Sequence, residues 1–319
     1  MNQMPFFSVI IPVYNKEKFI EKTLKSVLNQ TFTDFEVIVI NDCSTDGSLE
    51  KVRKFIFENL KIIQHDKNRG LSATRNTGIK NSNGVVMAFL DADDTWDSGY
   101  LEKIHSLHIE FPEAKLLATN YTDVIDQNVM ITPKNFYIPY ENDIIVEDFF
   151  KINCSKPIYF PGSFCVFKSV FETIGLYDEA ITFAEDVDFN IRANSKYKLA
   201  YSPISFVKYT QFSENQITNS SFKNKVIPDL NKYESLSNNN RSLKKYLDFN
   251  RYIFAKMYSL ENCSEEAKKL IKEIDFNSLN TSQKILLKTP SFILIILKKI
   301  KLYFLKKGII ISSYYYKPR

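Results

Sequence analysis

An apolar run that passes directly into three carboxylates constrains this 319-residue chain more than any other feature. The run ends in Phe89-Leu90-Asp91-Ala92-Asp93-Asp94, and residues 84–88 before it are also apolar. A continuous apolar segment of this kind is typical of a strand buried on both faces of a parallel sheet. Because an unpartnered buried carboxylate is costly, the acids must lie where the strand leaves the sheet. In open α/β sheets that edge binds ligands.

Asp91 and Asp93 can reach one point only if the backbone turns between them. Two carboxylates at a strand end suit Mg²⁺ or Mn²⁺, which keep further coordination positions for water and phosphate oxygens. The alternative is an acidic turn in which Asp94 caps the next helix. This stretch alone is compatible with both interpretations.

Strands and helices alternate through the first 120 residues. Strands are predicted at residues 7–13, 35–40, 61–64, 85–90 and 114–120, and helices at 16–30, from 48, at 72–81 and at 99–111. The alternation predicts an α/β fold with a mostly parallel sheet and helices on both faces. Tyr14, Asp42 and Asp91 each follow a predicted strand, so these polar residues would lie together at one edge of that sheet. No G-x-G-x-x-G motif follows the first strand and no G-x-x-x-x-G-K-[ST] motif occurs, so a metal ion would hold the phosphates of a bound nucleotide.

A second acidic cluster, Glu185-Asp186-Val187-Asp188, lies in a less regular part of the chain. Residues 121–156 show no clear pattern, residues 159–167 resemble a strand with a Pro-Gly turn, and a predicted helix at 169–174 ends at Gly175. The cluster precedes a predicted helix at 189–195. One of its acids can act as a general base. The alternative is that the acids only stabilise the positive end of the helix dipole.

Cysteine and histidine usage narrows the classes of function. The four cysteines are scattered without a C-x-x-C pair, which indicates neither a zinc site nor a disulfide framework and suits a reducing compartment. His105 and His108 lack further ligands nearby and are interpreted as a surface pair. Neither a signal peptide nor an apolar stretch long enough to span a membrane is expected.

The charges are distributed unevenly along the chain. Residues 1–218 contain 22 Lys and Arg against 29 Asp and Glu, whereas residues 219–319 contain 20 against 8. Thr289 as a cap and Pro290 as the first residue predict a helix that reads SFILIILKKIKLYFLKK. Its apolar face is predicted to hold Ile293, Leu297, Ile300 and Phe304. The pattern favours a helix that lies in an anionic membrane surface through residues 289–311; packing on the rest of the protein is the alternative.

Five segments resemble one known family. They are PVYN after the first strand, NDCSTDG after the second, KNRGLSATRNTG, FLDADD and IGLYDEAITFAEDVDFNIR. In this order they resemble the family 2 inverting glycosyltransferases, over about residues 6–218. The resemblance implies a Rossmann-like GT-A domain at 1–218, with a nucleotide-binding half at about 1–120 and an acceptor and base half at 121–218. A helical, basic, membrane-associating region would follow at 219–319.

The resemblance also implies roles for individual residues. The nucleotide-sugar site would contain Tyr14, Asp42, Asn68, Arg75 and Asp91, with Asp42 accepting a hydrogen bond from the base and Arg75 near the diphosphate. Asp91 and Asp93 would form a D-x-D motif, in which Asp93 is the direct ligand of Mn²⁺ or Mg²⁺.

On the acceptor side, Asp186 matches the position of the catalytic base, with Glu185 beside it. Trp96 and Arg192 match positions near the acceptor or supporting the base. The remaining acids are interpreted as caps or turn residues; they are Asp46, Asp94, Asp97 and Asp188.

Two positions depart from the family pattern. Ser213 stands where the family often has a histidine, so an imidazole contact to the metal or phosphate is not expected. Cys43 stands where the loop after the second strand usually has a glycine, a change that this loop is expected to tolerate.

The expected function is therefore an inverting, metal-dependent transfer of a sugar from a nucleotide sugar, UDP-linked, to a glycan or lipid-linked acceptor. A carboxylate would take the proton of the acceptor hydroxyl, and a divalent ion would offset the charge of the leaving diphosphate. The expected location is the cytoplasm, peripheral to the inner face of the cell membrane. One alternative is a non-catalytic sugar-nucleotide or glycan-binding module of the same fold. A nucleic-acid binder is the other, and the acidic first 218 residues argue against it.

Overall fold

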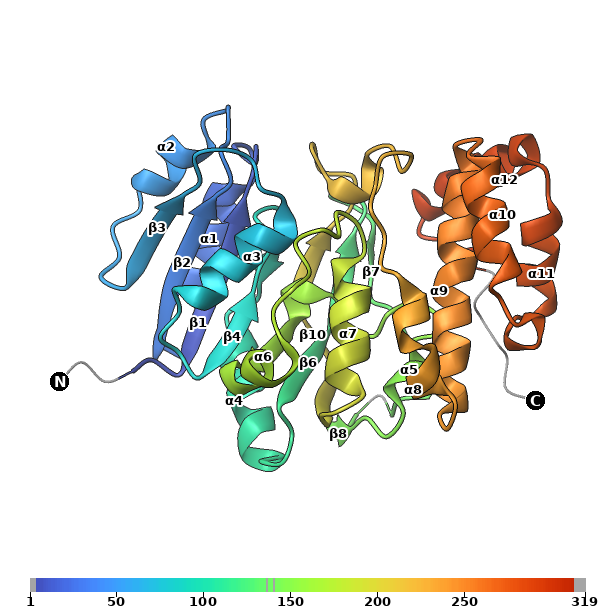
Figure 1. Cartoon of the computed structure of the whole chain (residues 1–319). Coiled ribbons are helices and arrows are strands. Elements are labelled where there is room, and N and C mark those ends of the chain that lie inside the picture. Colours follow the sequence, from blue (N-terminus) through green and yellow to red (C-terminus); the bar gives the residue numbers. More distant parts are fainter. Residues whose placement is uncertain (1–3, 136, 140, 313–319) are drawn as a thin grey trace.

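The computed structural model describes residues 4–135, 137–139 and 141–312. They form one sheet of ten strands in the order β3-β2-β1-β4-β9-β6-β10-β5, with β7 and β8 paired to its second half. Helices cover both faces of this sheet, and a group of C-terminal helices lies at the end farthest from β3 (Figure 1). The predicted α/β class with a Rossmann-like sheet is confirmed.

The first half of the sheet is entirely parallel. It contains β1 (Phe7–Val13), β2 (Phe35–Asn41), β3 (Leu60–Gln64) and β4 (Val86–Phe89). Every residue of β1, β2 and β4 is buried, because helices pack on both faces. The connecting helices are α1 (Ile20–Leu28), α2 (Ser48–Arg53) and α3 (Leu71–Lys80). The predicted pattern of strands and helices is confirmed here, with shifted ends.

The second half of the sheet mixes strand directions. Its two long strands, β6 (Leu116–Val124) and β10 (Leu199–Thr210), are parallel to each other. Between β4 and β6 runs β9 (Phe164–Phe167), antiparallel to both. Three two-residue strands complete the sheet as antiparallel partners; they are β5 (Thr95–Trp96), β7 (Met130–Ile131) and β8 (Ile144–Ile145).

Several predicted bounds in this half are wrong. The strand predicted at 159–167 is only β9, because Pro161–Ser163 form a 3-10 turn before it. The stretch 121–156 continues β6 and contains β7, β8 and α5 (Phe149–Ile152). His105 and His108 are half-buried against the rings of Phe6 and Phe167 instead of being a surface pair.

Three helices surround the second half of the sheet. They are α4 (Tyr100–Glu110), α6 (Lys168–Ile174) and α7 (Glu185–Asn194). The predicted stop at Gly175 is confirmed, since Gly175 follows α6 with a φ of 82° that favours glycine. Helix α7 begins at the acids themselves, four residues before the predicted start, because Ala184 adopts a left-handed conformation (φ 60°) and turns the chain directly into the helix.

Residues 234–305 are mainly helical, as predicted for this region, from α8 (Glu234–Ser237) to α12 (Ser291–Leu305). Between them lie α9 (Arg241–Leu260), α10 (Ser264–Lys272) and α11 (Thr281–Lys288). Helix α9 joins this group to the sheet domain, where the ring of Tyr246 lies 6.0 Å from Phe149 and 5.5 Å from Phe150.

The start signal predicted for the tail helix is wrong in detail. Thr289 ends α11, and its hydroxyl donates to the carbonyl of Ile285 at 2.8 Å instead of capping α12. Pro290 precedes α12, which has no side-chain cap. Across the described residues, no helix combines the length and apolar character that crossing a membrane requires.

Candidate active site

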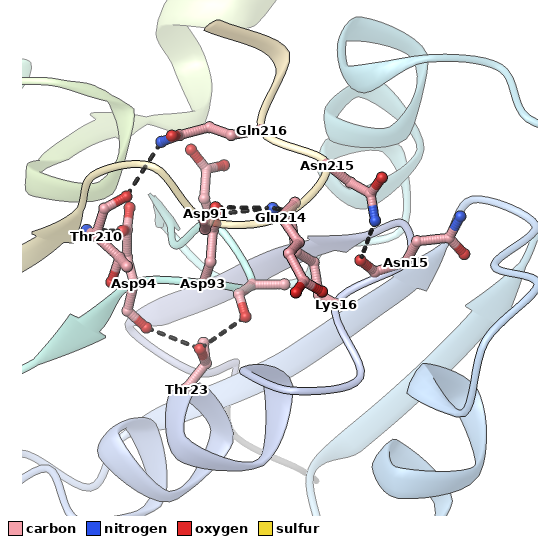
Figure 2. Close-up of polar contacts among 12 residues, drawn as sticks. Asn15, Lys16, Thr23, Asp91, Asp93, Asp94, Thr210, Glu214, Asn215 and Gln216 are labelled. Carbon is pink, nitrogen blue, oxygen red and sulfur yellow. Dashed lines mark hydrogen bonds and ion pairs between the residues drawn. The ribbon is translucent and has the colours of Figure 1, made fainter. Parts of the chain in front are cut away.

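The turn after β4 places the three acids of the D-x-D stretch. The N–H of Asp94 donates to the carbonyl of Asp91 at 3.0 Å, which reverses the chain as it leaves the sheet. Helix α1 holds this turn, because the hydroxyl of Thr23 lies 3.0 Å from the Ala92 carbonyl and 2.8 Å from the Asp94 carbonyl (Figure 2). The backbone turn that two converging carboxylates require is therefore present.

Asp94 is not a helix cap. Its side chain is fully buried, and its Oδ1 accepts from the N–H of Thr210 at 2.8 Å at the end of β10. Within the described chain its Oδ2 has no partner. Burial, followed by the charges of Asp93 and Asp91, holds the pKa of Asp94 well above its ordinary range. This carboxyl fastens β10 to the D-x-D turn, while α4 begins farther on, at Tyr100.

Arg75 joins the two acidic clusters. It lies on α3, is 1% exposed, and donates from Nη1 to Glu185 at 2.6 Å and from Nη2 to Asp91 at 3.0 Å. The acids raise the pKa of Arg75 against the effect of its burial. The expected position of Arg75 near the diphosphate stays a prediction. In the structure, Arg75 forms an ion pair with one carboxylate from each acidic cluster. A guanidinium suits this task because its N–H groups form a rigid fork.

Asp186 is the acid of the second cluster whose pKa is raised. Burial, aided by the neighbouring Glu185 and opposed by Arg75, raises the pKa of Asp186 from 3.8 to about 6. Glu185 is buried and paired to Arg75. A general base works best when its pKa lies near the working pH. The arrangement therefore suits Asp186 as the base and Glu185 as its support.

Asp93 is already occupied by a cation. The ammonium of Lys16 lies 2.7 Å from its Oδ2, and the hydroxyl of Ser213 donates to the same oxygen. Figure 2 shows Asp91, Asp93, Lys16 and Glu214 gathered at the edge of the sheet.

Asp91 and Asp93 fit a divalent cation by the chemistry of their donors. In the described part of the chain, Asp91 Oδ2 and Asp93 Oδ1 have no hydrogen-bond partner. Hard oxygen donors of this type suit Mg²⁺ and Mn²⁺. No group of three or more His, Cys, Asp or Glu side chains among the described residues is arranged to hold a metal ion. The remaining ligands would have to be water and substrate oxygens.

The residues predicted to bind the nucleotide base lie around Asp42. This side chain is 2% exposed; its Oδ1 lies 2.7 Å from His65 Nδ1 and accepts from the N–H of Arg69 at 2.8 Å, while Oδ2 accepts from the N–H of Gly70 at 2.9 Å. Asp42 thus shapes the loop that contains Asn68. Tyr14 is 41% exposed at the end of β1. Contact of these residues with a nucleotide base stays a prediction.

Trp96 and Arg192 have structural partners. The Trp96 indole is buried and donates to the Gly162 carbonyl at 2.8 Å. Arg192 pairs with Asp188 at 2.7 Å and donates to the Ile174 carbonyl at 2.7 Å, so it clamps α7, the helix of the base, to the end of α6. Asp188 also accepts from the hydroxyl of Tyr233 and is therefore part of this clamp instead of a cap.

Three contributors were missed from the sequence. They are Lys16, His65 and the contact of Ser213 with Asp93. Their hydrogen bonds join segments that are between 23 and 197 residues apart in the chain. Lys16 directly follows the PVYN segment, which is the one sequence signal that could have drawn attention to it. Nothing local indicates that its side chain turns toward Asp93.

Comparisons with known proteins support one assignment. Residues 8–175 match the model of "Glycosyl transferase family 2". Glycosyltransferase AglE of Haloferax volcanii is 31% identical over 210 residues, covering 62% of this chain and 65% of the relative. The Escherichia coli protein named UDP-Glc:alpha-D-GlcNAc-diphosphoundecaprenol beta-1,3-glucosyltransferase WfgD is 33% identical over 124 residues, covering 39% of this chain and 48% of the relative. The match thus spans less than two thirds of the length of either relative.

A solved structure supports the fold. Staphylococcus aureus TarS 1–349 in complex with UDP-GlcNAc superimposes with a TM-score of 0.58 at 22% identity, covering 79% of this chain and 70% of that chain. At this identity the similarity shows the GT-A architecture and leaves the substrate of this chain open.

Proposed function

Because the chain belongs to glycosyl transferase family 2, we propose that it is an inverting transferase that moves a sugar from a UDP-sugar to a hydroxyl of a glycan or lipid-linked acceptor. The double ion pair of Arg75 is the observation that supports this proposal most. One guanidinium holds Asp91 of the D-x-D turn and Glu185 beside the base, so the donor and acceptor sides of the site are tied together.

In the proposed mechanism, Asp186 accepts the proton of the acceptor hydroxyl as that oxygen attacks C1 of the donor sugar. UDP leaves from the opposite face, so a single displacement inverts the anomeric centre. A divalent ion held by Asp91 and Asp93 supplies positive charge for the leaving diphosphate when it is bound. Arg75 holds Glu185 in place through their ion pair. Burial, followed by the nearby Glu185, raises the pKa of Asp186 to about 6.

UDP as the nucleotide is supported by two of the similar proteins. The Escherichia coli protein is named for UDP-Glc and an undecaprenol-diphosphate acceptor, and the TarS structure contains UDP-GlcNAc. We extend the nucleotide and the acceptor class to this chain as a proposal. The donor sugar is left to experiment.

The test is release of UDP from a panel of UDP-sugars with MnCl₂, followed by mass spectrometry of the product formed on lipid-linked acceptors. The proposal expects UDP release from at least one donor and a product heavier by one sugar. Calorimetric binding of UDP without release or transfer by any donor would instead favour the non-catalytic sugar-nucleotide module.

We also propose that α12 attaches the enzyme to an anionic membrane surface through residues 289–311. Helix α12 contacts α9 on the side of its buried Leu294. Three residues of the predicted apolar face, Ile293, Leu297 and Ile300, are exposed. Lys301 and Lys307 are also exposed and flank this face. An exposed apolar surface bordered by lysines is the arrangement of a helix that lies in a membrane interface.

This attachment implies a working place at the cytoplasmic, inner face of the cell membrane. The four cysteines are free, in keeping with a reducing compartment. A peripheral position would bring the site close to a lipid-linked acceptor.

A further inference from the structure

The ammonium of Lys16 is built into the D-x-D site. It donates to Asp93 Oδ2 at 2.7 Å, to Ser213 Oγ at 3.1 Å and to the carbonyl of Glu214 at 2.7 Å. These contacts use all three of its N–H donors. The side chains of Lys16 and Asp93 are only 10% and 8% exposed. Lys16 is therefore a fixed cation of the site and not a solvated surface lysine.

This cation lies on the carboxylate proposed to bind the metal. Asp93 Oδ2 accepts from both Lys16 and Ser213, so its lone pairs are used and Oδ1 is the oxygen of this carboxylate that stays open. A divalent ion that binds Asp93 would meet a positive charge at the same carboxylate, where the two repel strongly in a partly buried setting. Lys16 and the divalent ion therefore compete for Asp93.

The same contact closes a segment over the site. We call residues 211–216, which follow β10, the strap. Beyond Lys16, the strap is held by an exposed ion pair between Lys18 and Glu214 at 2.6 Å. Asn215 donates to the Asn15 carbonyl at 3.3 Å (Figure 2), and Gln211, at the start of the strap, donates to Asp123 at 2.8 Å. Among these partners of the strap, Lys16 is the residue that also contacts an acid of the D-x-D pair.

Lys16 has space into which it can move. It lines a cavity of about 240 Å³ that is bounded by residues 15–19, Thr45, Asp46, Glu214 and Asn215. A lysine has four rotatable side-chain carbons, so its ammonium can leave Asp93 without a shift of the backbone.

We propose that Lys16 is an internal cation that occupies Asp93 in the ligand-free protein, and that a divalent ion gains Asp93 only by displacing it and releasing the strap. This inference rests on the proposed function, because it requires a metal-binding D-x-D pair. It gives the lysine a role in ordering the reaction: a divalent ion alone binds weakly, whereas UDP offers the displaced ammonium a new anionic partner and so favours binding of the ion. The metal and the nucleotide are then coupled through one side chain.

The test measures binding of Mn²⁺ to the full chain by electron paramagnetic resonance, with Mn²⁺ alone and with Mn²⁺ plus UDP. Lys16→Met and Lys16→Gln remove the charge from Asp93, and the glutamine keeps N–H donors for the strap. Both are expected to bind Mn²⁺ alone about tenfold or more tightly than the wild type, because the competing state is lost. The gain in Mn²⁺ affinity that UDP produces should shrink in both.

Lys18→Met is the matched control. It removes the same unit charge from the same segment and one contact of the strap, but leaves Lys16 on Asp93. Its Mn²⁺ affinity should stay within about twofold of the wild type, which is well below a tenfold change. Thermal unfolding of each variant confirms that it is folded before binding is measured.

Three outcomes would overturn the inference. Equal Mn²⁺ affinity in wild type and both Lys16 variants would show that the ammonium does not compete, and would leave the proposed function intact. The same gain in Lys18→Met would show that net charge or a loose strap, not the contact with Asp93, controls the ion. If no protein binds Mn²⁺ even with UDP, the inference fails together with the metal part of the proposed function.

Discussion

Glu185 and Asp186 are neighbours in the chain, but their surroundings assign them different tasks. Asp186→Asn keeps the shape and removes the proton acceptor, so we expect kcat to fall by about 10²–10⁴-fold, as for loss of a general base. Binding of the UDP-sugar should be largely kept, because the proposed role of Asp186 is to accept the proton of the acceptor hydroxyl and not to bind the donor. UDP-release kinetics and calorimetric donor binding measure the two effects separately.

Glu185→Gln is the matched change at the next position. It weakens the ion pair with Arg75, which is buried, so its main expected effect is a loss of stability with a smaller loss of kcat. A crippling effect of Glu185→Gln beside a mild effect of Asp186→Asn would reverse the two assignments.

The pH profile of transfer should follow the Asp186 carboxyl, whose pKa is raised from 3.8 to about 6 mainly by burial. Because the base must be ionised, kcat/KM should fall about tenfold per pH unit below that value. Stability has the opposite sign: a carboxyl with a raised folded-state pKa contributes stability below 3.8 and loses it as the pH rises through about 6. An acidic limb near 4, or one that persists in Asp186→Asn, would contradict this prediction.

Removal of the metal should stop turnover. Asp93→Ala deletes the predicted direct ligand, so we expect no measurable UDP release with MnCl₂, and the wild type in EDTA should behave in the same way. Asp97→Ala is the control, since Asp97 lies four residues beyond Asp93 and is paired at the surface with Lys208. Full activity of the wild type in EDTA would exclude the metal.

At the scale of helices and strands, the sequence predicts those features that are determined by a local pattern of residues. Buried strands such as β1 and β2 read as continuous apolar runs because both faces are covered, and Gly175 ends α6 through a conformation that few other residues adopt. The same local logic placed Asp91 and Asp93 at the sheet edge. These features need no knowledge of the rest of the chain.

Features that depend on distant segments were not predictable. The four residues of β9 run antiparallel because their partners, β4 and β6, come from other parts of the chain. Asp94 resembles a helix cap in sequence, yet the N–H of Thr210, 116 residues away, binds it in the interior. Lys16 reaches Asp93 in the same way, since a long flexible side chain carries no local signal of its direction.

Helix α1 is predicted to support the D-x-D turn through Thr23. Thr23→Val keeps the shape but leaves the buried carbonyls of Ala92 and Asp94 without its hydroxyl, which should cost about 1–3 kcal/mol. Thr31→Val is the control, because the Thr31 hydroxyl bonds Glu102 at the exposed surface. Urea unfolding should destabilise the first variant and leave the second nearly unchanged; equal midpoints would remove α1 from this role.

At the scale of the whole molecule, the basic region forms a separate end. The helices α9 to α12 lie at the end of the molecule farthest from β3 (Figure 1). Residues 219–319 contain an excess of 12 basic residues, whereas residues 1–218 contain an excess of 7 acids. An anionic surface would attract the helical end and repel the rest, which orients the enzyme as well as attaching it.

The exposed face of α12 gives this model a direct test. Ile296 and Ile300 are 53% and 44% exposed, so Ile296→Gln/Ile300→Gln removes apolar area while keeping every lysine and the packing of Leu294. Insertion of such side chains into a membrane interface supplies part of the binding free energy, and each lysine near an anionic surface adds about 1 kcal/mol. The double variant should therefore sediment much less with anionic liposomes than the wild type, which itself should dissociate in high salt.

The control makes the same substitutions at exposed isoleucines outside the helical end. Ile56→Gln/Ile109→Gln changes residues that are 98% and 66% exposed, and it should sediment with anionic liposomes as the wild type does. Both double variants should release UDP in solution at the wild-type rate, because none of the four residues is near the acids. A wild-type protein that ignores anionic liposomes at low salt would leave α12 with packing on α9 as its only role. Equal loss in the two double variants would show that exposed apolar area in general, and not this helix, causes the binding.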